Sequence, residues 1–141
     1  MGLEPKNIMF SEDYQNIKLI DFGASSMLFT SSRHTSSAAR GSSRYMSPEQ
    51  AEQTLCFGID IWAFGCILLQ FATNVTPFQN SDSILNMDLS SVKDRMNPLE
   101  YAYRHFQDNC DLLTSNPDLS YLLRSCFERE HTKRPSAKEL M

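Results

Sequence analysis

The spacing of hydrophobic and polar residues changes along the chain, and each spacing predicts a type of secondary structure. Two short β-prone pieces, residues 7–10 and 16–20, flank a polar turn and predict a small hairpin. No later segment has the pattern of a strand, so the sheet is expected to end there. Residues 24–43 are rich in Ser, Thr, Ala and Arg without apolar periodicity, which predicts a long loop of the kind that is usually functional or disordered.

Helical spacing dominates the second half of the chain. Residues 59–71 are apolar on every side and predict a helix buried in the middle of the domain, with Asp60 as a charge to be explained. Further helices are predicted to begin near Pro98, at Asn116 or Pro117, and at Ser136. Without repeats or linkers, residues 1–141 are predicted to form one unit, mainly α with a small β-hairpin.

Composition narrows the class of protein. The 141 residues are 41% hydrophobic and 21% charged, as in ordinary globular domains. A formal net charge of -4 favours neither nucleic acid nor a membrane surface as a partner. The four cysteines lie far apart and predict reduced thiols in an intracellular, cytoplasmic protein. The longest apolar run is too short to cross a bilayer, no secretory signal precedes it, and no histidine has partners at metal-ligand spacing.

Four motifs follow one another in a fixed order. They are Leu-Glu-Pro-Lys-Asn-Ile at 3–8, Asp-Phe-Gly at 21–23, Gly-Ser-Ser-Arg-Tyr-Met-Ser-Pro-Glu at 41–49, and Asp-Ile-Trp-Ala-Phe-Gly at 60–65 with His-Thr-Lys-Arg-Pro at 131–135. Asp-Phe-Gly alone is a weak signal, but the whole order resembles the eukaryotic protein kinase family of the serine/threonine type. The resemblance covers essentially the whole chain.

This resemblance implies an incomplete kinase C-terminal lobe that begins in the catalytic loop. The activation segment is expected at residues 21–49 and a helical subdomain at residues 50–141. The glycine-rich loop, anchoring lysine and partner glutamate of the N-terminal lobe are not found in the sequence. An intact parent would use ATP and Mg²⁺ to phosphorylate serine or threonine of a protein substrate, whereas this chain alone is expected to bind ATP weakly and to lack kinase activity.

Two positions match the metal ligands of the family. Phosphoryl transfer requires magnesium, which prefers carboxylate and amide oxygens, and by resemblance Asp21 and Asn7 supply them. The alternative is a helix-capping aspartate and a turn-forming asparagine. Phe22 is implied to pack beneath a helix of the N-terminal lobe and to be exposed without it, and Gly23 completes the motif.

Three catalytic-loop positions depart from the family pattern. Gly2 stands where the family has its catalytic aspartate, Glu4 where it has a phosphate-contacting lysine, and Met1 where it has an arginine. A carboxylate near phosphate is unfavourable. Lys6 stands where the family often has an acidic residue, so Glu4 and Lys6 resemble a charge-swapped pair, and whether Lys6 takes over the missing role stays open. An internal start codon or a cloning junction would explain Met1 and Gly2 equally well.

The remaining matches concern scaffold and regulation. By resemblance, Glu49 and Arg134 form a buried ion pair, and Asp60 accepts backbone hydrogens of the catalytic loop, unless it is a simple N-terminal helix carboxylate. The other matching positions are Trp62 of the scaffold, Pro48 at the end of the activation segment, and Ser42 and Pro5, which favour the serine/threonine class. The possible phosphosites, between two arginines, are Thr35, Ser36 and Ser37, with an ordinary solvated loop as the alternative.

Two expectations concern partners. Apolar surfaces of Phe22, Ile67 and Phe71 would be covered by elements absent from the chain, which predicts self-association. A pseudokinase-like protein-binding module is the alternative function, with its groove around Tyr45 and residues 80–116. An open reading frame upstream of Met1 that encodes the missing kinase motifs would favour the enzyme, and a stop codon would favour the binding module.

Overall fold

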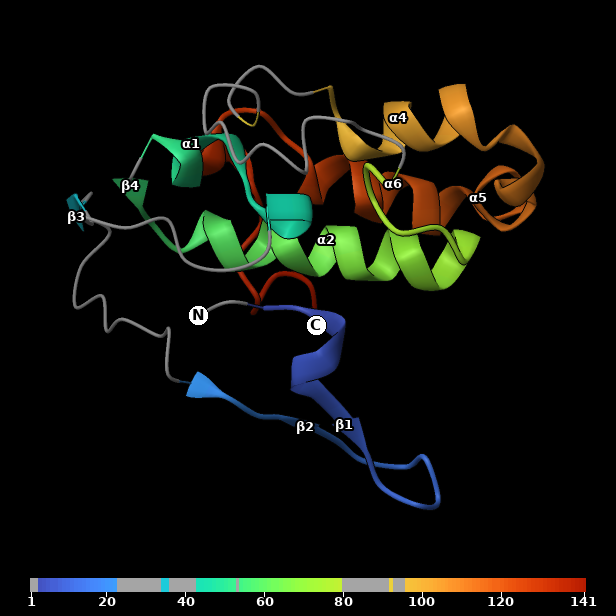
Figure 1. Cartoon of the computed structure of the whole chain (residues 1–141), viewed down its shortest axis with the longest axis horizontal. Coiled ribbons are helices and arrows are strands. Elements are labelled where there is room, and N and C mark those ends of the chain that lie inside the picture. The colour runs from blue at the N-terminus through green and yellow to red at the C-terminus, as the bar shows by residue number, and fades with distance from the viewer. Residues whose placement is uncertain (1–2, 23–33, 36–42, 53, 80–91, 93–95) are drawn as a thin grey trace.

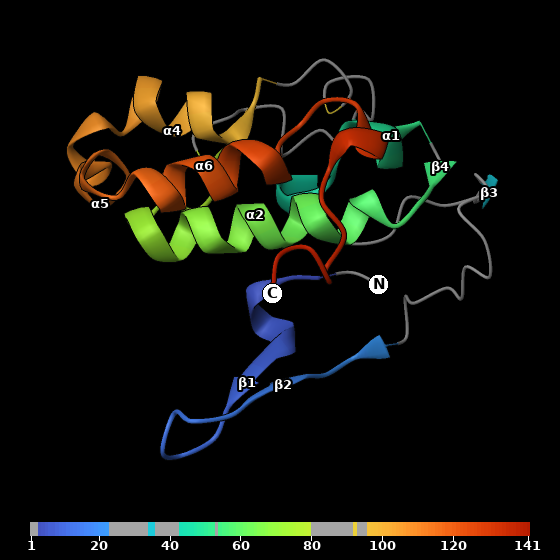
Figure 2. The ribbon, with the colours of Figure 1, turned by 180° about the vertical axis from the view of Figure 1, so that it is seen from behind.

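The computed structural model describes residues 3–22, 34–35, 43–52, 54–79, 92 and 96–141. Helices form a layered body, and a β-hairpin projects from it (Figure 1). Within the body, α2 contacts both α6 and α4, and the three helices appear in the order α4, α6, α2 from top to bottom in the front and the back view (Figure 2). The helices are α1 (Pro48–Ala51), α2 (Gly58–Thr73), α4 (Pro98–His105), α5 (Asp111–Ser115) and α6 (Pro117–Cys126). Short 3₁₀ turns are η1 (Pro5–Asn7), η3 (Ser43–Tyr45), η5 (Gln107–Asn109) and η6 (His131–Lys133).

The predicted hairpin is present. Strand β1 (Ile8–Phe10) pairs antiparallel with β2 (Ile17–Leu19), with Met9 opposite Lys18. The turn closes where the backbone N–H of Ser11 donates to the carbonyl of Asn16 over 2.9 Å. The polar residues between the two apolar pieces therefore form the turn that their composition predicts.

A second strand pair shows that the expected end of the sheet content was wrong. Strand β3 (His34–Thr35) pairs antiparallel with β4 (Thr54–Leu55). Each strand has only two residues, so neither is long enough to carry the alternation by which a strand is recognised in a sequence. This pairing joins His34 and Thr35 to the segment between α1 and α2.

Asparagine caps begin two of the predicted helices. The Asn97 side chain accepts the Leu99 N–H over 2.9 Å, and the Asn116 side chain accepts the Leu119 N–H over 3.0 Å. Proline follows each cap at the first helical position, where its missing N–H costs no hydrogen bond. The predicted starts near Pro98 and at Asn116 are confirmed.

The helix expected from Ser136 is not formed. The hydroxyl of Ser136 accepts the Glu139 N–H, and the Glu139 carboxylate accepts the Ser136 N–H over 2.8 Å. This reciprocal pattern is a capping box, but here it closes a single turn. A helix start signal is local, whereas propagation requires a packed face, and residues 136–139 are all exposed.

The core lies where α2 meets α5 and α6. Gly65 allows α2 to approach α6, because a Cβ atom at this position would lie 2.7 Å from Cβ of Cys126 and 2.9 Å from the Phe127 ring. The ring of Trp62 packs edge-on against Phe127, with ring centroids 5.3 Å apart. The buried cluster consists of Tyr45, Trp62, Ala63, Cys66, Ile67, Leu69, Leu99, Ala102, Cys110, Leu113, Leu123 and Phe127.

One side of α2 departs from the prediction of a helix buried all round. Phe57, Phe64 and Phe71 recur every seven residues, which places them along one line of the helix, and all three are exposed. Asp60 is exposed on the same side. The continuous apolar run of this helix therefore covers two surfaces, the core and an outward aromatic stripe, defined here as Phe57, Phe64 and Phe71.

The helices of the described ranges include none that is both long and apolar enough to cross a membrane.

Candidate functional site

The 3₁₀ turn η1 positions the first group of candidate residues. Pro5 occupies its first position, and the Asn7 N–H donates to the Glu4 carbonyl over 2.9 Å. This tight turn buries Glu4 and Asn7 and leaves Lys6 exposed. Because the turn passes directly into β1, Asn7 lies at the base of the hairpin.

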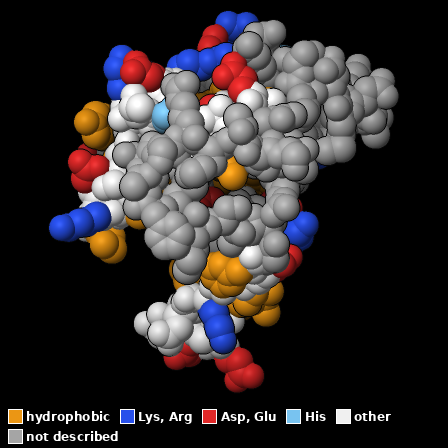
Figure 3. All heavy atoms as spheres, turned by 90° about the vertical axis from the view of Figure 1, so that its left-hand side faces the viewer, with side chains coloured by type: hydrophobic (Ala, Val, Ile, Leu, Met, Phe, Trp, Pro, Cys, Tyr) orange, Lys and Arg blue, Asp and Glu red, His pale blue; other side chains and the backbone are white. Residues whose placement is uncertain are grey.

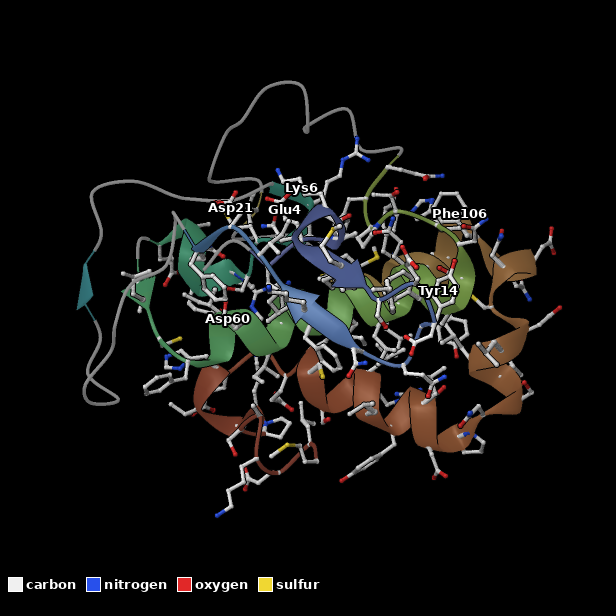
Figure 4. All side chains as sticks on the ribbon, turned by 90° about the horizontal axis from the view of Figure 1, so that it is seen from below. Glu4, Lys6, Tyr14, Asp21, Asp60 and Phe106 are labelled. Atoms are coloured by element: carbon white, nitrogen blue, oxygen red, sulfur yellow. The ribbon has the colours of Figure 1, made fainter. Side chains whose placement is uncertain are left out.

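A backbone hydrogen bond joins this turn to the Asp-Phe-Gly segment. The N–H of Ile20 donates to the carbonyl of Asn7 over 2.9 Å, continuing the strand pairing by one step. The next residue, Asp21, has φ of 58°, a left-handed conformation that few residues other than glycine adopt. Because Asp21 follows Ile20, it lies at the same end of the hairpin as Asn7, and Figure 4 shows Asp21 there beside Glu4 and Lys6 in that view.

An ion pair occupies the position of the two charge-swapped residues. The Lys6 ammonium lies 3.0 Å from Oε2 of Glu4. The Glu4 side chain is only 11% exposed, whereas that of Lys6 is 70% exposed. Figure 4 shows both side chains on the same side of the ribbon as Asp21. Lys6 therefore offsets the negative charge that Glu4 brings to this end of the hairpin.

The donor set at the hairpin base fits magnesium held together with a phosphorylated ligand. Magnesium keeps several waters and usually takes one or two carboxylates plus phosphate oxygens, so it needs few protein ligands. Asp21 offers a carboxylate and Asn7 an amide oxygen. In the part of the chain that the structure describes, no cluster of three His, Cys, Asp or Glu could hold a metal by itself. A metal here would thus depend on its ligand.

A second ion pair, between Glu49 and Arg134, joins distant segments of the helical body, as predicted. Arg134 donates from Nη1 to Oε1 of Glu49 over 2.5 Å and from Nη2 to Oε2 over 3.0 Å. The two residues are 7% and 6% exposed and stand 85 positions apart in the sequence. The planar guanidinium matches the carboxylate at two points, which fixes both distance and orientation.

Arg134 has further partners that the sequence did not indicate. Its Nε donates to the carbonyl of Glu128 over 2.8 Å, and Nη1 also donates to the carbonyl of Gly58 over 2.8 Å. Its Cζ lies 4.8 Å from the centroid of the Trp62 ring. One side chain therefore ties α1, the start of α2 and the segment after α6 together.

The electrostatics of Glu49 reflect these contacts. Burial alone would raise the pKa of Glu49, but the hydrogen bonds and the charge of Arg134 hold the pKa below its ordinary value. The thiol of Cys56 lies 3.9 Å from Oε1 of Glu49. Burial and this nearby carboxylate raise the pKa of Cys56, so its thiol stays protonated.

Asp60 lies near the start of α2, as predicted. Desolvation raises the pKa of Asp60, although part of its surface is exposed. By resemblance, this carboxylate is expected to accept backbone hydrogens from the catalytic loop. That role stays a prediction.

Other predicted site residues have mixed outcomes. Phe22 is 58% exposed, as expected, and Pro48 opens α1 in a buried position. Ile67 is only 2% exposed, so its expected role in an uncovered surface was wrong, because it faces the core between α2 and its neighbours. Gly2, Gly23, Ser36, Ser37 and Ser42 lie outside the described residues. Thr35 is described only by its backbone in β3.

The groove expected for a binding module includes residues 80–91 and 93–95, which lie outside the described residues, and Tyr45, which contributes little open surface. Its side chain is 9% exposed, and its hydroxyl donates to Oε1 of Gln70 over 2.7 Å. Burial raises the pKa of Tyr45. The hydroxyl thus fastens η3 to α2 from inside the core.

Comparison with known proteins identifies the family. The family model described as "Protein kinase domain" matches residues 1–141, and the chain belongs to this family. It is 30% identical to MAP3K epsilon protein kinase 2 of Arabidopsis thaliana over an alignment of 128 residues. This alignment covers 89% of the chain and 8% of that protein. It is 31% identical to calcium-dependent protein kinase 6 of Plasmodium berghei over 140 residues, an alignment that covers 99% of the chain and 9% of that protein.

A third relative is human 3-phosphoinositide-dependent protein kinase 1. The chain is 34% identical to it over 85 residues, which is 59% of the chain and 15% of that protein. The chain thus spans less than a sixth of the length of each of these relatives. The family model, these protein kinase relatives and the order of the motifs agree that the chain is a protein kinase fragment.

Sequence reasoning missed two features of the surface and core. The aromatic stripe is visible in the sequence as phenylalanines at intervals of seven, a signal hidden by the apolar residues around it. The carbonyl partners of Arg134 left no signal, because backbone groups do not depend on residue type.

Proposed function

We propose that residues 1–141 form the C-terminal part of a serine/threonine kinase domain. The intact protein transfers the γ-phosphate of ATP to serine or threonine of a protein substrate. The observation that supports this proposal is that Asn7 and Asp21 lie at the same end of the hairpin, as the backbone bond between Ile20 and Asn7 implies. The amide of Asn7 and the carboxylate of Asp21 would suit Mg²⁺ held together with nucleotide phosphates.

The 141 residues by themselves are proposed to be inactive. Gly2 has no side chain that could orient a hydroxyl or accept its proton, and a positioned base contributes roughly 10²- to 10⁴-fold in rate. No Gly-x-Gly-x-x-Gly sequence occurs among the 141 residues to cover the phosphates. Asn7 and Asp21 would hold Mg²⁺ when nucleotide is bound, and the metal would neutralise phosphate charge.

Transfer of labelled phosphate tests this proposal. The full-length protein and residues 1–141 are each incubated with Mg²⁺, γ-labelled ATP and serine/threonine peptide pools. We expect label transfer by the full-length protein only, abolished by Asp21→Ala and unaffected by Asp108→Ala at an exposed site on η5. Transfer that survives Asp21→Ala would contradict the assigned site.

A protein-binding module is a second candidate, favoured by the departures at Gly2 and Glu4. A surface pocket of about 360 Å³ between α4 and α6 offers one place for a partner, lined by Asn97, Leu99, Glu100, Tyr103 and Arg124. It combines apolar and charged groups, as protein-binding sites do. An inactive full-length protein that still binds a partner through Arg124, and loses it in Arg124→Ala, would favour this function.

Self-association of the isolated chain is proposed from its exposed apolar side chains. The aromatic stripe of α2 and one face of the hairpin are uncovered, and Figure 3 shows hydrophobic side chains near the lower end of the molecule, where the hairpin lies. Uncovered apolar surface of this kind promotes association. Light scattering of residues 1–141 should show oligomers that Phe71→Ser reduces and Thr132→Ser, at an exposed polar position, does not.

A further inference from the structure

We propose that Lys6 contacts the terminal phosphate of the nucleotide, with Glu4 as its positioning residue. This inference rests on the proposed kinase function and deepens it. It assigns a phosphate-binding cation to a position next to the metal ligand Asn7, although the motif has a carboxylate at position 4.

The location of the ammonium carries the first step. Lys6 precedes Asn7 in η1, and its ammonium reaches back to 3.0 Å from Oε2 of Glu4. The cation therefore lies beside the tip of residue 4. It lies on the same side of the ribbon as Asp21, the second candidate metal ligand (Figure 4).

The donors of Lys6 carry the second step. An ammonium has three N–H donors, and the bond to Glu4 uses one of them. Because the Lys6 side chain is 70% exposed, its other donors face solvent and are accessible to an incoming ligand. An ionised phosphate oxygen accepts a charge-assisted hydrogen bond from an ammonium, and such bonds are roughly twice as strong as neutral ones.

The burial of Glu4 carries the third step. A carboxylate that is 11% exposed cannot turn freely into solvent, so it holds the flexible lysine side chain in one direction. Without Lys6, this carboxylate would repel phosphate at the same end of the hairpin. Glu4 alone would therefore be unfavourable beside phosphate, whereas in the pair it holds the ammonium of Lys6 in place. Another lysine of the hairpin, Lys18, lies in β2 opposite Met9 and has no such support among the interactions that the structure describes.

Nucleotide affinity tests the proposal without relying on activity. Binding of Mg·ATP and Mg·ADP to the full-length protein is measured by calorimetry, and the ratio of the two affinities isolates the terminal phosphate. We expect Lys6→Met to lower this ratio roughly tenfold, as loss of one charge-assisted bond implies, with ADP affinity unchanged. Lys6→Arg keeps most of the ratio. Lys133→Met, which breaks the surface pair with Glu130, leaves it unaltered.

A charge exchange separates the phosphate contact from folding. The double variant Glu4→Lys/Lys6→Glu keeps one ammonium and one carboxylate, so it is informative even if Lys6→Met does not fold. We expect a lowered ratio in this variant too, because its ammonium stands at the buried position 4 and its carboxylate at the exposed position 6. A ratio that stays at the wild-type value in folded Lys6→Met, or in the double variant, overturns the role of Lys6.

The outcomes also distinguish this inference from the proposed function. A full-length protein that binds both nucleotides but transfers no phosphate overturns the kinase activity, while the affinity ratio still decides the role of Lys6. A protein that binds neither nucleotide overturns both. Transfer activity with a ratio insensitive to Lys6→Met overturns only the inference.

Discussion

Two ion pairs built on buried glutamates behave differently in the helical body and at the base of the hairpin. Glu49 and Glu4 are 6% and 8% exposed, yet Arg134 is buried with its carboxylate while the Lys6 side chain is 70% exposed. Arg134 also donates to backbone carbonyls of distant segments, and Lys6 pairs with a residue two positions away. The cation, not the glutamate, distinguishes the two pairs.

This difference separates a structural pair from one that is available to a ligand. A buried guanidinium with all sides occupied cannot leave without exposing unpaired groups, so it fixes the fold. An exposed ammonium is screened by water, contributes little to stability and keeps free donors. Substitutions in the two regions should therefore differ in the size of their effect on unfolding.

The largest effect is expected from Arg134→Ala. It leaves Glu49 buried without its partner and removes three segment contacts, so the free energy of unfolding should fall by about 3–5 kcal/mol. Urea denaturation measures the change. Arg104→Ala is the control, because Arg104 pairs with Glu100 on the surface of α4 and such pairs contribute about 0.3–0.5 kcal/mol. Equal effects of the two substitutions would contradict the structural role of Arg134.

Leucine truncation extends the comparison from charges to packing. Leu123 on α6 is fully buried in the core, whereas Leu19 on β2 is 39% exposed. Leu123→Ala should cost about 2–5 kcal/mol, since it leaves a cavity among packed neighbours. Leu19→Ala should cost less than half of that. Comparable midpoints in thermal unfolding of the two variants would show that the hairpin is packed more tightly than its exposure indicates.

Much of the body could be predicted from the sequence because its signals are local. Proline after asparagine marks the starts of α4 and α6, and the apolar run marks α2. The pairing of Glu49 with Arg134 was available only through resemblance, since no local pattern links positions 85 residues apart. The two-residue strands β3 and β4 had no detectable pattern, and the capping box at Ser136 predicted a helix that its exposed residues do not support.

The hairpin base was harder to predict. The charge exchange between Glu4 and Lys6 is visible in the sequence, but its distance and the difference in burial require coordinates. The exposure of Phe71 was expected through the resemblance, but that of Phe64 was hidden, because an apolar run shows which residues could be buried and not which side has a neighbour. A sequence pattern therefore predicts elements more reliably than the surfaces that they leave open.

The pH dependence of stability should distinguish the body from the rest of the molecule. Because the folded-state pKa of Glu49 lies below its ordinary value of 4.5, the charged form stabilises the fold fully above that pH. This contribution is lost as the pH falls from about 4.5 through the folded-state pKa, with a slope of at most about 1.4 kcal/mol per pH unit for one group. Glu49→Gln should remove the contribution of Glu49 to the change of unfolding free energy with pH. Urea denaturation at several pH values between pH 5 and 2.5, a range chosen to include the titration of Glu49, measures this change. An unchanged slope would contradict the assignment.

The smallest effect on stability is expected from Lys6→Ala, which removes the exposed cation of the pair at the base of the hairpin. An exposed ammonium gains little from its partner, so the free energy of unfolding should change by less than about 1 kcal/mol. Salt screens such pairs, and with a Debye length of about 3 Å at 1 M the difference between wild type and variant should largely vanish there. The difference caused by Arg134→Ala should persist at the same salt concentration, because its pair is buried. Unfolding curves of the three proteins at low and high salt measure this directly. A loss in Lys6→Ala as large as in Arg134→Ala, and equally insensitive to salt, would mean that Glu4 depends on Lys6 for folding and that the ammonium is not available to a ligand.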